Sequence, residues 1–147
     1  MLAETGEYLT NLFGYNKILM MNTGVEAVET SLKIARRWAY EVKGVEENQA
    51  RVLFCEGNFM GRTIAVIGAS EEESRYKNFG PFKGMNFDLI EYNDLKMLEK
   101  MLSSSNNYAA FFVEPIQGEA GVIIPSKGYL KKAKAICKKY NVLLIAD

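Results

Sequence analysis

Residues 111–122 read FFVEPIQGEAGV, and the character of the chain changes within this stretch. Two aromatic residues and a valine are typical of a buried strand, which would end at Glu114. A proline, a second carboxylate at Glu119 and two glycines follow, and such a composition is typical of a loop. Two carboxylates beside flexible backbone at the end of a core strand indicate the rim of an active site.

Similar apolar runs recur along the chain and alternate with segments of helical periodicity. We expect strands at residues 17–22, 51–56, 87–92, 109–115 and 142–147. We expect helices at residues 4–13, 23–44, 64–67 and 127–140, a further short helix capped by Asn93, and a surface loop at 71–83. Strands that are apolar almost throughout and alternate with helices predict an α/β fold with a mainly parallel sheet flanked by helices.

The segment 23–44 is the clearest helix in the sequence. Thr23 and Glu26 fit the capping-box pattern at its start, and Gly44 suits the position just after its end. Its apolar residues step by three and four and form one stripe that we expect to lie in the core: Val25, Val28, Leu32, Ala35, Ala39 and Val42.

Composition and charge restrict the function. The 147 residues are 48% hydrophobic, enough for one domain with a core. The 18 basic and 18 acidic residues balance, which argues against nucleic acid or an anionic membrane as the main partner. There is no His to act as a general base or metal ligand, and we expect no metal site.

The cysteines and the start of the chain indicate the compartment. Cys55 and Cys137 form no CxxC motif, so we expect two reduced core thiols. No apolar run approaches the roughly 20 residues that span a bilayer, and the chain does not begin like a signal or transit peptide. We expect a soluble cytoplasmic protein, or a protein of the mitochondrial matrix if a presequence is missing.

Polar residues follow three of the expected strands, at 56–62, at 114–119 and at Asp147. The carboxyl ends of parallel strands meet at one edge of a sheet, and α/β proteins bind their ligands there. We therefore expect these three groups to contribute to one site.

The start of the helix at 23–44 is a candidate anion site. The first amide groups of a helix have no helical partners and lie at the positive end of its dipole, which favours a phosphate at Thr23, Gly24 and Val25. The alternative is that Thr23 only caps the helix. In the loop GNFMGRT, Phe59 suits stacking on a flat ligand and Arg62 suits a carboxylate, the alternative being a loop anchor with a surface ion pair.

The acidic candidates leave several roles open. Asp147 follows a buried strand, where a carboxylate needs a partner. It suits a protonated ring nitrogen, a metal ion or a phosphoryl group, unless it emerges into water. Glu114 and Glu119 suit an acid/base pair; alternatively Glu119 neutralises an active-site Arg while Glu114 orients its neighbours, or both are solvated loop acids.

Six stretches in this order resemble the class III pyridoxal-phosphate aminotransferases, and among them the ornithine aminotransferases. They are MNTGVEAVETSLKIARRW, GNFMGRT, FGPF, YNDL, VEPIQGEAGV and LLIAD, and the resemblance runs from Asn11 to Asp147. It implies a fold-type I PLP-transferase, with residues 1–147 forming the N-terminal and central part of the large cofactor-binding domain. It also implies amino-acid and 2-oxo-acid substrates and a homodimer.

The resemblance implies roles for individual residues. Gly24 and Val25 match the amides that hold the phosphate of pyridoxal 5′-phosphate, and Phe59 matches the aromatic residue stacked on its ring. Asp147 matches the acid that pairs with the ring nitrogen and keeps it protonated, which makes the ring a better electron sink. Arg62 matches a binder of the substrate carboxylate. Glu119 matches an acid that masks an Arg, located beyond Asp147, while ornithine gives its δ-amino group to the cofactor.

Two residues and one absence depart from this family pattern. Met60 stands where Trp is frequent and Met20 where Pro is frequent, and both changes affect only packing. The lysine that links covalently to the cofactor has no counterpart here, because that lysine lies after the IAD strand. We therefore expect this chain to be a fragment that does not catalyse transamination by itself, although the parent protein does.

Two alternatives remain. One is another class III enzyme, such as an acetylornithine or 4-aminobutyrate aminotransferase. The other is a non-enzymatic phosphoacceptor or Mg²⁺-binding module, since a strand-end Asp suits both. That module needs further acids at the end of the first strand, where Glu56 is the only one, and it leaves GNFMGR and EPIQGEAG unexplained.

Overall fold

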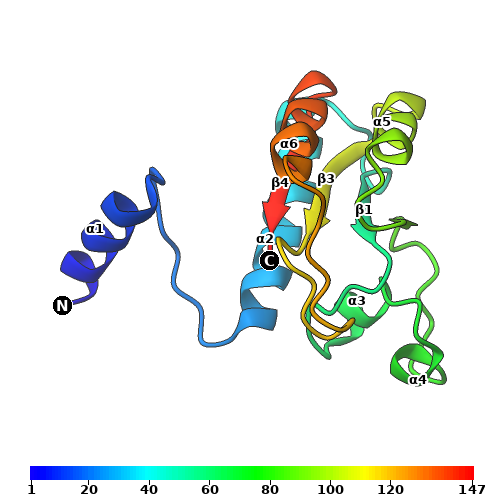
Figure 1. Cartoon of the computed structure of the whole chain (residues 1–147), viewed down its shortest axis with the longest axis horizontal. Coiled ribbons are helices and arrows are strands. Elements are labelled where there is room, and N and C mark those ends of the chain that lie inside the picture. The colour runs from blue at the N-terminus through cyan, green and yellow to red at the C-terminus, as the bar shows by residue number, and fades with distance from the viewer.

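The computed structural model describes all residues 1–147 and is built around a parallel sheet of four strands in the order β2-β1-β3-β4 (Figure 1). The strands are β1 Arg51–Cys55, β2 Phe87–Ile90, β3 Tyr108–Val113 and β4 Leu143–Ala146. All six residues of β3 are buried, as expected for a central strand with both faces covered. The predicted α/β fold with a parallel sheet is confirmed.

The alternation of side chains along the strands builds two cores. Val52 and Phe54 of β1 point to the face covered by α2 Gly24–Trp38, together with Ala110 and Phe112 of β3. The intervening residues of both strands point to the opposite face, which α5 Leu95–Ser104 and α6 Tyr129–Lys139 cover. The sheet is thus the middle of three layers.

The buried thiols Cys55 and Cys137 are both unpaired, as predicted. Both lie in the core on the α5 and α6 side of the sheet. Burial raises the pKa of each thiol to about 12, so neither is a reactive thiolate at neutral pH.

Helix α2 continues as a π-helical turn, Ala39–Lys43, and ends at Gly44 in the left-handed conformation. The predicted stripe is buried at four positions, Val28, Leu32, Ala35 and Ala39. The prediction was wrong for Val42, which is 71% exposed. A π-helical turn holds more residues than an α-helical turn, so the stripe rotates away from the sheet at this end.

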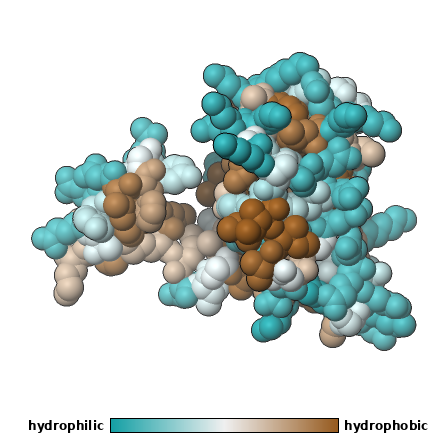
Figure 2. Space-filling model, viewed as in Figure 1, coloured by the Kyte–Doolittle hydropathy of each residue, from teal (hydrophilic) through white to brown (hydrophobic).

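Helix α1 Leu2–Phe13 has no buried residue and lies apart from the sheet, joined to it by an extended segment (Figure 1). Its apolar side chains are visible on the surface in Figure 2. The strand predicted at residues 17–22 was wrong: the segment forms no ladder, and Ile18, Leu19 and Met20 are exposed. A strand requires a partner for its amide and carbonyl groups, and no strand lies beside this segment.

The remaining elements are short. They are α3 Ile64–Ile67, as predicted, and α4 Glu73–Tyr76, which interrupts the predicted loop at 71–83. The prediction that Asn93 caps α5 was wrong: Asp94 is the capping residue and accepts hydrogen bonds from the amides of Lys96 and Met97. The Asn93 side chain instead accepts two hydrogen bonds from Ser126, which tie the start of α5 to the loop before α6. None of the helices combines the length and the apolar composition of a membrane span.

Candidate functional site

The strand order places a topological switch point between β1 and β3. From β1 the chain continues to β2 on one side, and it then returns to β3 on the other side. In such sheets the loops after the two strands diverge and leave a crevice at their carboxyl ends. The loop 56–62 follows β1, the loop 114–119 follows β3 and Asp147 follows β4, so the three predicted groups share this edge.

The start of α2 carries two amide groups without a partner. The Thr23 hydroxyl accepts a hydrogen bond from the Glu26 amide (3.2 Å), and the Glu26 carboxylate accepts from the amides of Asn22 (2.7 Å) and Thr23 (3.2 Å). The amides of Gly24 and Val25 donate to no protein group, and Gly24 is exposed. Thr23 therefore caps the helix, and the two free donors beyond it suit an anion.

The loop after β1 packs directly against this helix terminus. Gly61 has a φ of +120°, and a Cβ atom built there would lie 2.3 Å from Cγ2 of Val25. Only glycine permits this approach. The contact brings the loop that carries Phe59 beside the free amides of α2.

Glu114 joins the loops on both sides of the switch point. Its side chain is buried, and its Oε1 accepts from the Phe59 amide (3.0 Å) while Oε2 accepts from the Gly118 amide (3.3 Å). The Tyr92 hydroxyl donates to the carbonyl oxygen of Glu114 (3.0 Å). With both carboxylate oxygens engaged by amides, the Glu114 side chain is a buried hydrogen-bond acceptor and not a solvated loop acid.

Two buried amide side chains hold the same loops and were not singled out in the sequence. Gln117 is 1% exposed and donates from Nε2 to the carbonyl of Glu56 (2.7 Å). Asn58 donates from Nδ2 to the carbonyls of Cys55 and Ala69, both at 2.8 Å. A polar residue beside a glycine directly after a core strand is the signal that identifies such residues, because the turning backbone there leaves carbonyl groups to satisfy.

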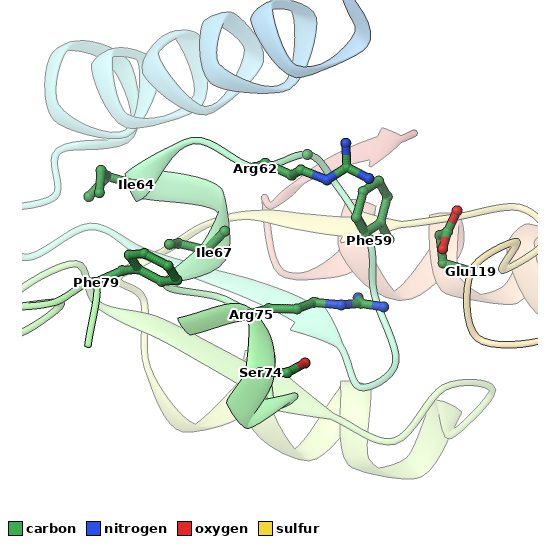
Figure 3. Close-up of a pocket in the computed structure, with 9 residues that line it drawn as sticks. Phe59, Arg62, Ile64, Ile67, Ser74, Arg75, Phe79 and Glu119 are labelled. Carbon is green, nitrogen blue, oxygen red and sulfur yellow. The ribbon is translucent and has the colours of Figure 1, made fainter. Parts of the chain in front are cut away.

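Phe59, Arg62 and Glu119 line one cavity of about 430 Å³. Its other lining residues are Gly61, Ile64, Ile67, Ser74, Arg75 and Phe79. Figure 3 shows the Phe59 ring between the side chains of Arg62 and Arg75. The two guanidinium groups lie 5.6 Å and 5.1 Å from the ring centroid, within the range of cation–π interactions.

Asp147 lies outside the wall of that cavity, at the end of β4. Its amide donates to the carbonyl of Val113 (3.1 Å), which continues the ladder with β3. The Asp147 residue is exposed at the end of the strand. Partial desolvation, and secondly the negative charge of Glu114, raise the pKa of its carboxyl above the ordinary value. A positive group next to this carboxyl would relieve both effects. No three His, Cys, Asp or Glu side chains are placed to hold a metal ion.

The arrangement therefore contains free amide donors for an anion, an aromatic ring for stacking, and a carboxyl that favours a cationic partner. These features lie on α2, on the loop after β1 and at the end of β4. They match the phosphate, the ring and the protonated nitrogen of a pyridine-type cofactor, and the exposed Arg62 suits a carboxylate.

Comparison with known proteins identifies the family of this chain. The family model of the class III aminotransferases matches residues 1–147. A probable mitochondrial ornithine aminotransferase of Caenorhabditis elegans is 56% identical over 146 residues, which cover 99% of this chain and 34% of that protein.

Solved structures give the same result. The ornithine aminotransferase of Toxoplasma gondii has a TM-score of 0.95 at 50% identity, covering 99% of this chain and 34% of that one. A second structure of that enzyme has partial occupancy of PLP at its active site. The acetylornithine aminotransferase of Elizabethkingia anophelis has a TM-score of 0.77 at 44% identity, covering 99% of this chain and 31% of that one.

These matches confirm the predicted fold, because the similar structures are fold-type I aminotransferases with the same α/β arrangement. The chain spans about a third of the length of the relatives it matches. Over its whole length, this chain belongs to the class III aminotransferases.

Proposed function

We propose that the whole protein is a pyridoxal-phosphate-dependent aminotransferase. It transfers the δ-amino group of ornithine to 2-oxoglutarate and yields glutamate semialdehyde and glutamate. The observation that carries the proposal is the contact of Gly61 with Val25, since it sets the loop that carries Phe59 beside the end of α2 with its two free amide donors. The choice of ornithine is supported by the names of the similar proteins.

The residues proposed to bind the cofactor are assigned by the chemical groups that they offer. The free amides of Gly24 and Val25 bind the phosphate, with the Thr23 hydroxyl beside them, and Phe59 stacks on the ring. Asp147 pairs with the protonated ring nitrogen, because its raised pKa reflects an environment that lacks a cation. When bound, the cofactor supplies the electron sink for the substrate carbon that loses a proton.

Arg62 and Glu119 act on the substrate. Arg62 forms no ion pair and no side-chain hydrogen bond, so its guanidinium is free to bind a substrate carboxylate. Glu119 is exposed on the same cavity and is placed to neutralise a cation while a monocarboxylate amino acid is bound. Glu114 touches no substrate; it holds the Phe59 loop in place.

The wider organisation is proposed on the same basis. Residues 1–147 form the N-terminal and central part of the large cofactor-binding domain, and the whole protein is a homodimer. Its substrates are small amino acids and 2-oxo acids, with no nucleic acid or membrane partner. The proposed location is the cytoplasm or the mitochondrial matrix, and the name of the Caenorhabditis elegans relative supports the second.

Absorbance spectroscopy of the whole protein tests the proposal. Titration with pyridoxal phosphate is expected to produce a saturable visible band, and ornithine without 2-oxoglutarate is expected to abolish it. Acetylornithine and 4-aminobutyrate, added in parallel, are expected to act more slowly. A faster reaction with either of these two donors would identify another class III activity, and the absence of any saturable band would refute the aminotransferase.

A further inference from the structure

The polar segment 69–76 lies against the loop that carries Phe59. The Gly57 amide donates to the Glu71 carboxylate (3.2 Å), and Asn58 donates to the Ala69 carbonyl (2.8 Å). Arg75 returns a hydrogen bond from Nη1 to the carbonyl of Asn58 (3.1 Å). These hydrogen bonds hold residues 57 and 58 of the loop against the segment 69–76, and they are separate from the hydrogen bonds of the sheet.

Arg75 is the centre of this contact. Its side chain is 27% exposed, its Nε pairs with Glu72 at 2.6 Å, and its guanidinium lies 5.1 Å from the centroid of Phe59. The helix α4 that carries it is a single turn. One side chain thus contacts the ring of Phe59, the backbone before it and an acid on its own segment.

Arg62 lies near the same ring but is held differently. Its guanidinium is 5.6 Å from the centroid, and it has no carboxylate or carbonyl partner. Figure 3 shows Phe59 between the two arginines, with Glu119 beyond the ring. Arg75, with three partners, is expected to keep its position when a ligand enters the cavity. Arg62 is exposed and has no hydrogen-bonding partner, so it can change its rotamer at a low cost in free energy.

We propose that Arg75 is a positioning residue: it holds the Phe59 ring from the side opposite Arg62, and it leaves the side of the ring near Arg62 for the cofactor. That the ring stacked on Phe59 belongs to the cofactor rests on the proposed function, whereas the immobilisation of Phe59 by Arg75 does not. Loss of Arg75 frees the ring rotamer and the loop, and ordering them again upon binding reduces the affinity for the cofactor by about three- to tenfold.

The test compares three variants of the whole protein. Arg75→Met removes the charge and all three contacts, and Arg75→Lys keeps the charge but not the fork geometry. Lys77→Met is the matched control, because Lys77 lies at the end of the same turn and forms only an exposed ion pair with Glu73. Hydrogen exchange of residues 57–62 is measured without cofactor, and the dissociation constant of pyridoxal phosphate and the KM for the amino donor are measured with it.

In Arg75→Met, hydrogen exchange at the Phe59 amide is expected to be about tenfold faster than in the wild type. The dissociation constant of the cofactor is expected to rise, while the KM for the amino donor is expected to stay constant. Arg75→Lys is expected to restore part of both losses, and Lys77→Met is expected to behave as wild type. Unchanged exchange in Arg75→Met would overturn the inference, and so would a rise in KM alone, which would make Arg75 a carboxylate binder. If the wild type binds no cofactor, the proposed function fails while the exchange data still decide the role of Arg75.

Discussion

At the scale of single residues, two positions fix the Phe59 loop between the start of α2 and the loop after β3. Gly61 lets the Phe59 loop approach Val25, and Glu114 accepts the Phe59 amide from the other side. The sequence singles out Glu114 but assigns Gly61 no role of its own. A glycine after a strand predicts a turn and not a contact with a distant helix, because the contact depends on how the elements pack.

Replacement of Gly61 by Ala is expected to lower the free energy of unfolding by roughly 2–4 kcal/mol, from backbone strain together with overpacking. The added Cβ would lie 2.3 Å from Val25, at a φ of +120°. Gly44→Ala is the control, since Gly44 also has a positive φ but no atom within 4 Å. It is expected to cost about 1 kcal/mol. Denaturant unfolding measures both, and equal losses would contradict the packing argument.

The pH dependence of cofactor binding is expected to report the raised pKa of Asp147. Partial desolvation and the charge of Glu114 both raise this pKa, so the carboxyl takes up a proton at a higher pH than an ordinary Asp. An interaction that needs the ionised carboxylate is present above the raised pKa and is lost as the pH falls through it.

Glu114→Gln removes one of the two causes and is expected to move this loss to lower pH. Glu119→Gln serves as the control, because Glu119 is not among the groups that shift the pKa of Asp147. The cofactor dissociation constant, measured against pH for the three proteins, decides the matter. The same midpoint in wild type and Glu114→Gln would contradict the proximity of the two acids.

At the scale of the elements, the start of α2 was well predicted and its neighbours less so. The capping box at Thr23 and Glu26 needs only local sequence, and it forms as expected. The run at residues 17–22 looked like a strand because it is apolar, but apolarity does not provide a hydrogen-bonding partner. Helix α4 was missed because one turn leaves almost no periodic signal, yet it carries Arg75.

Thr23→Ala is expected to destabilise the whole protein by about 1 kcal/mol, because the Glu26 amide loses its acceptor. The affinity for the cofactor is also expected to fall, since the hydroxyl beside the free amides is lost. Thr23→Ser keeps the hydroxyl and is expected to restore both properties. A Thr23→Ala protein with wild-type stability would show that the cap contributes nothing to α2.

At the scale of the whole molecule, the strand order β2-β1-β3-β4 makes one site from segments far apart in sequence. The alternation of elements predicted the layers and the edge at which polar residues gather, because both follow from local pattern. The pairing of β1 with β3 could not be predicted in this way, since periodicity does not tell which strands are neighbours. Gln117 and Asn58 were missed for a related reason, because the local sequence does not show that the carbonyls of Glu56 and Ala69 lie beside them.

A crystal structure of the whole protein with pyridoxal phosphate would show directly whether these segments form one cofactor site. The phosphate is predicted to accept hydrogen bonds of about 2.7–3.2 Å from the amides of Gly24 and Val25. The ring is predicted to stack on Phe59, with its nitrogen at the Asp147 carboxylate and Arg75 unmoved. A cofactor bound with its phosphate away from α2, or with its ring nitrogen facing no carboxylate, would contradict the assignment.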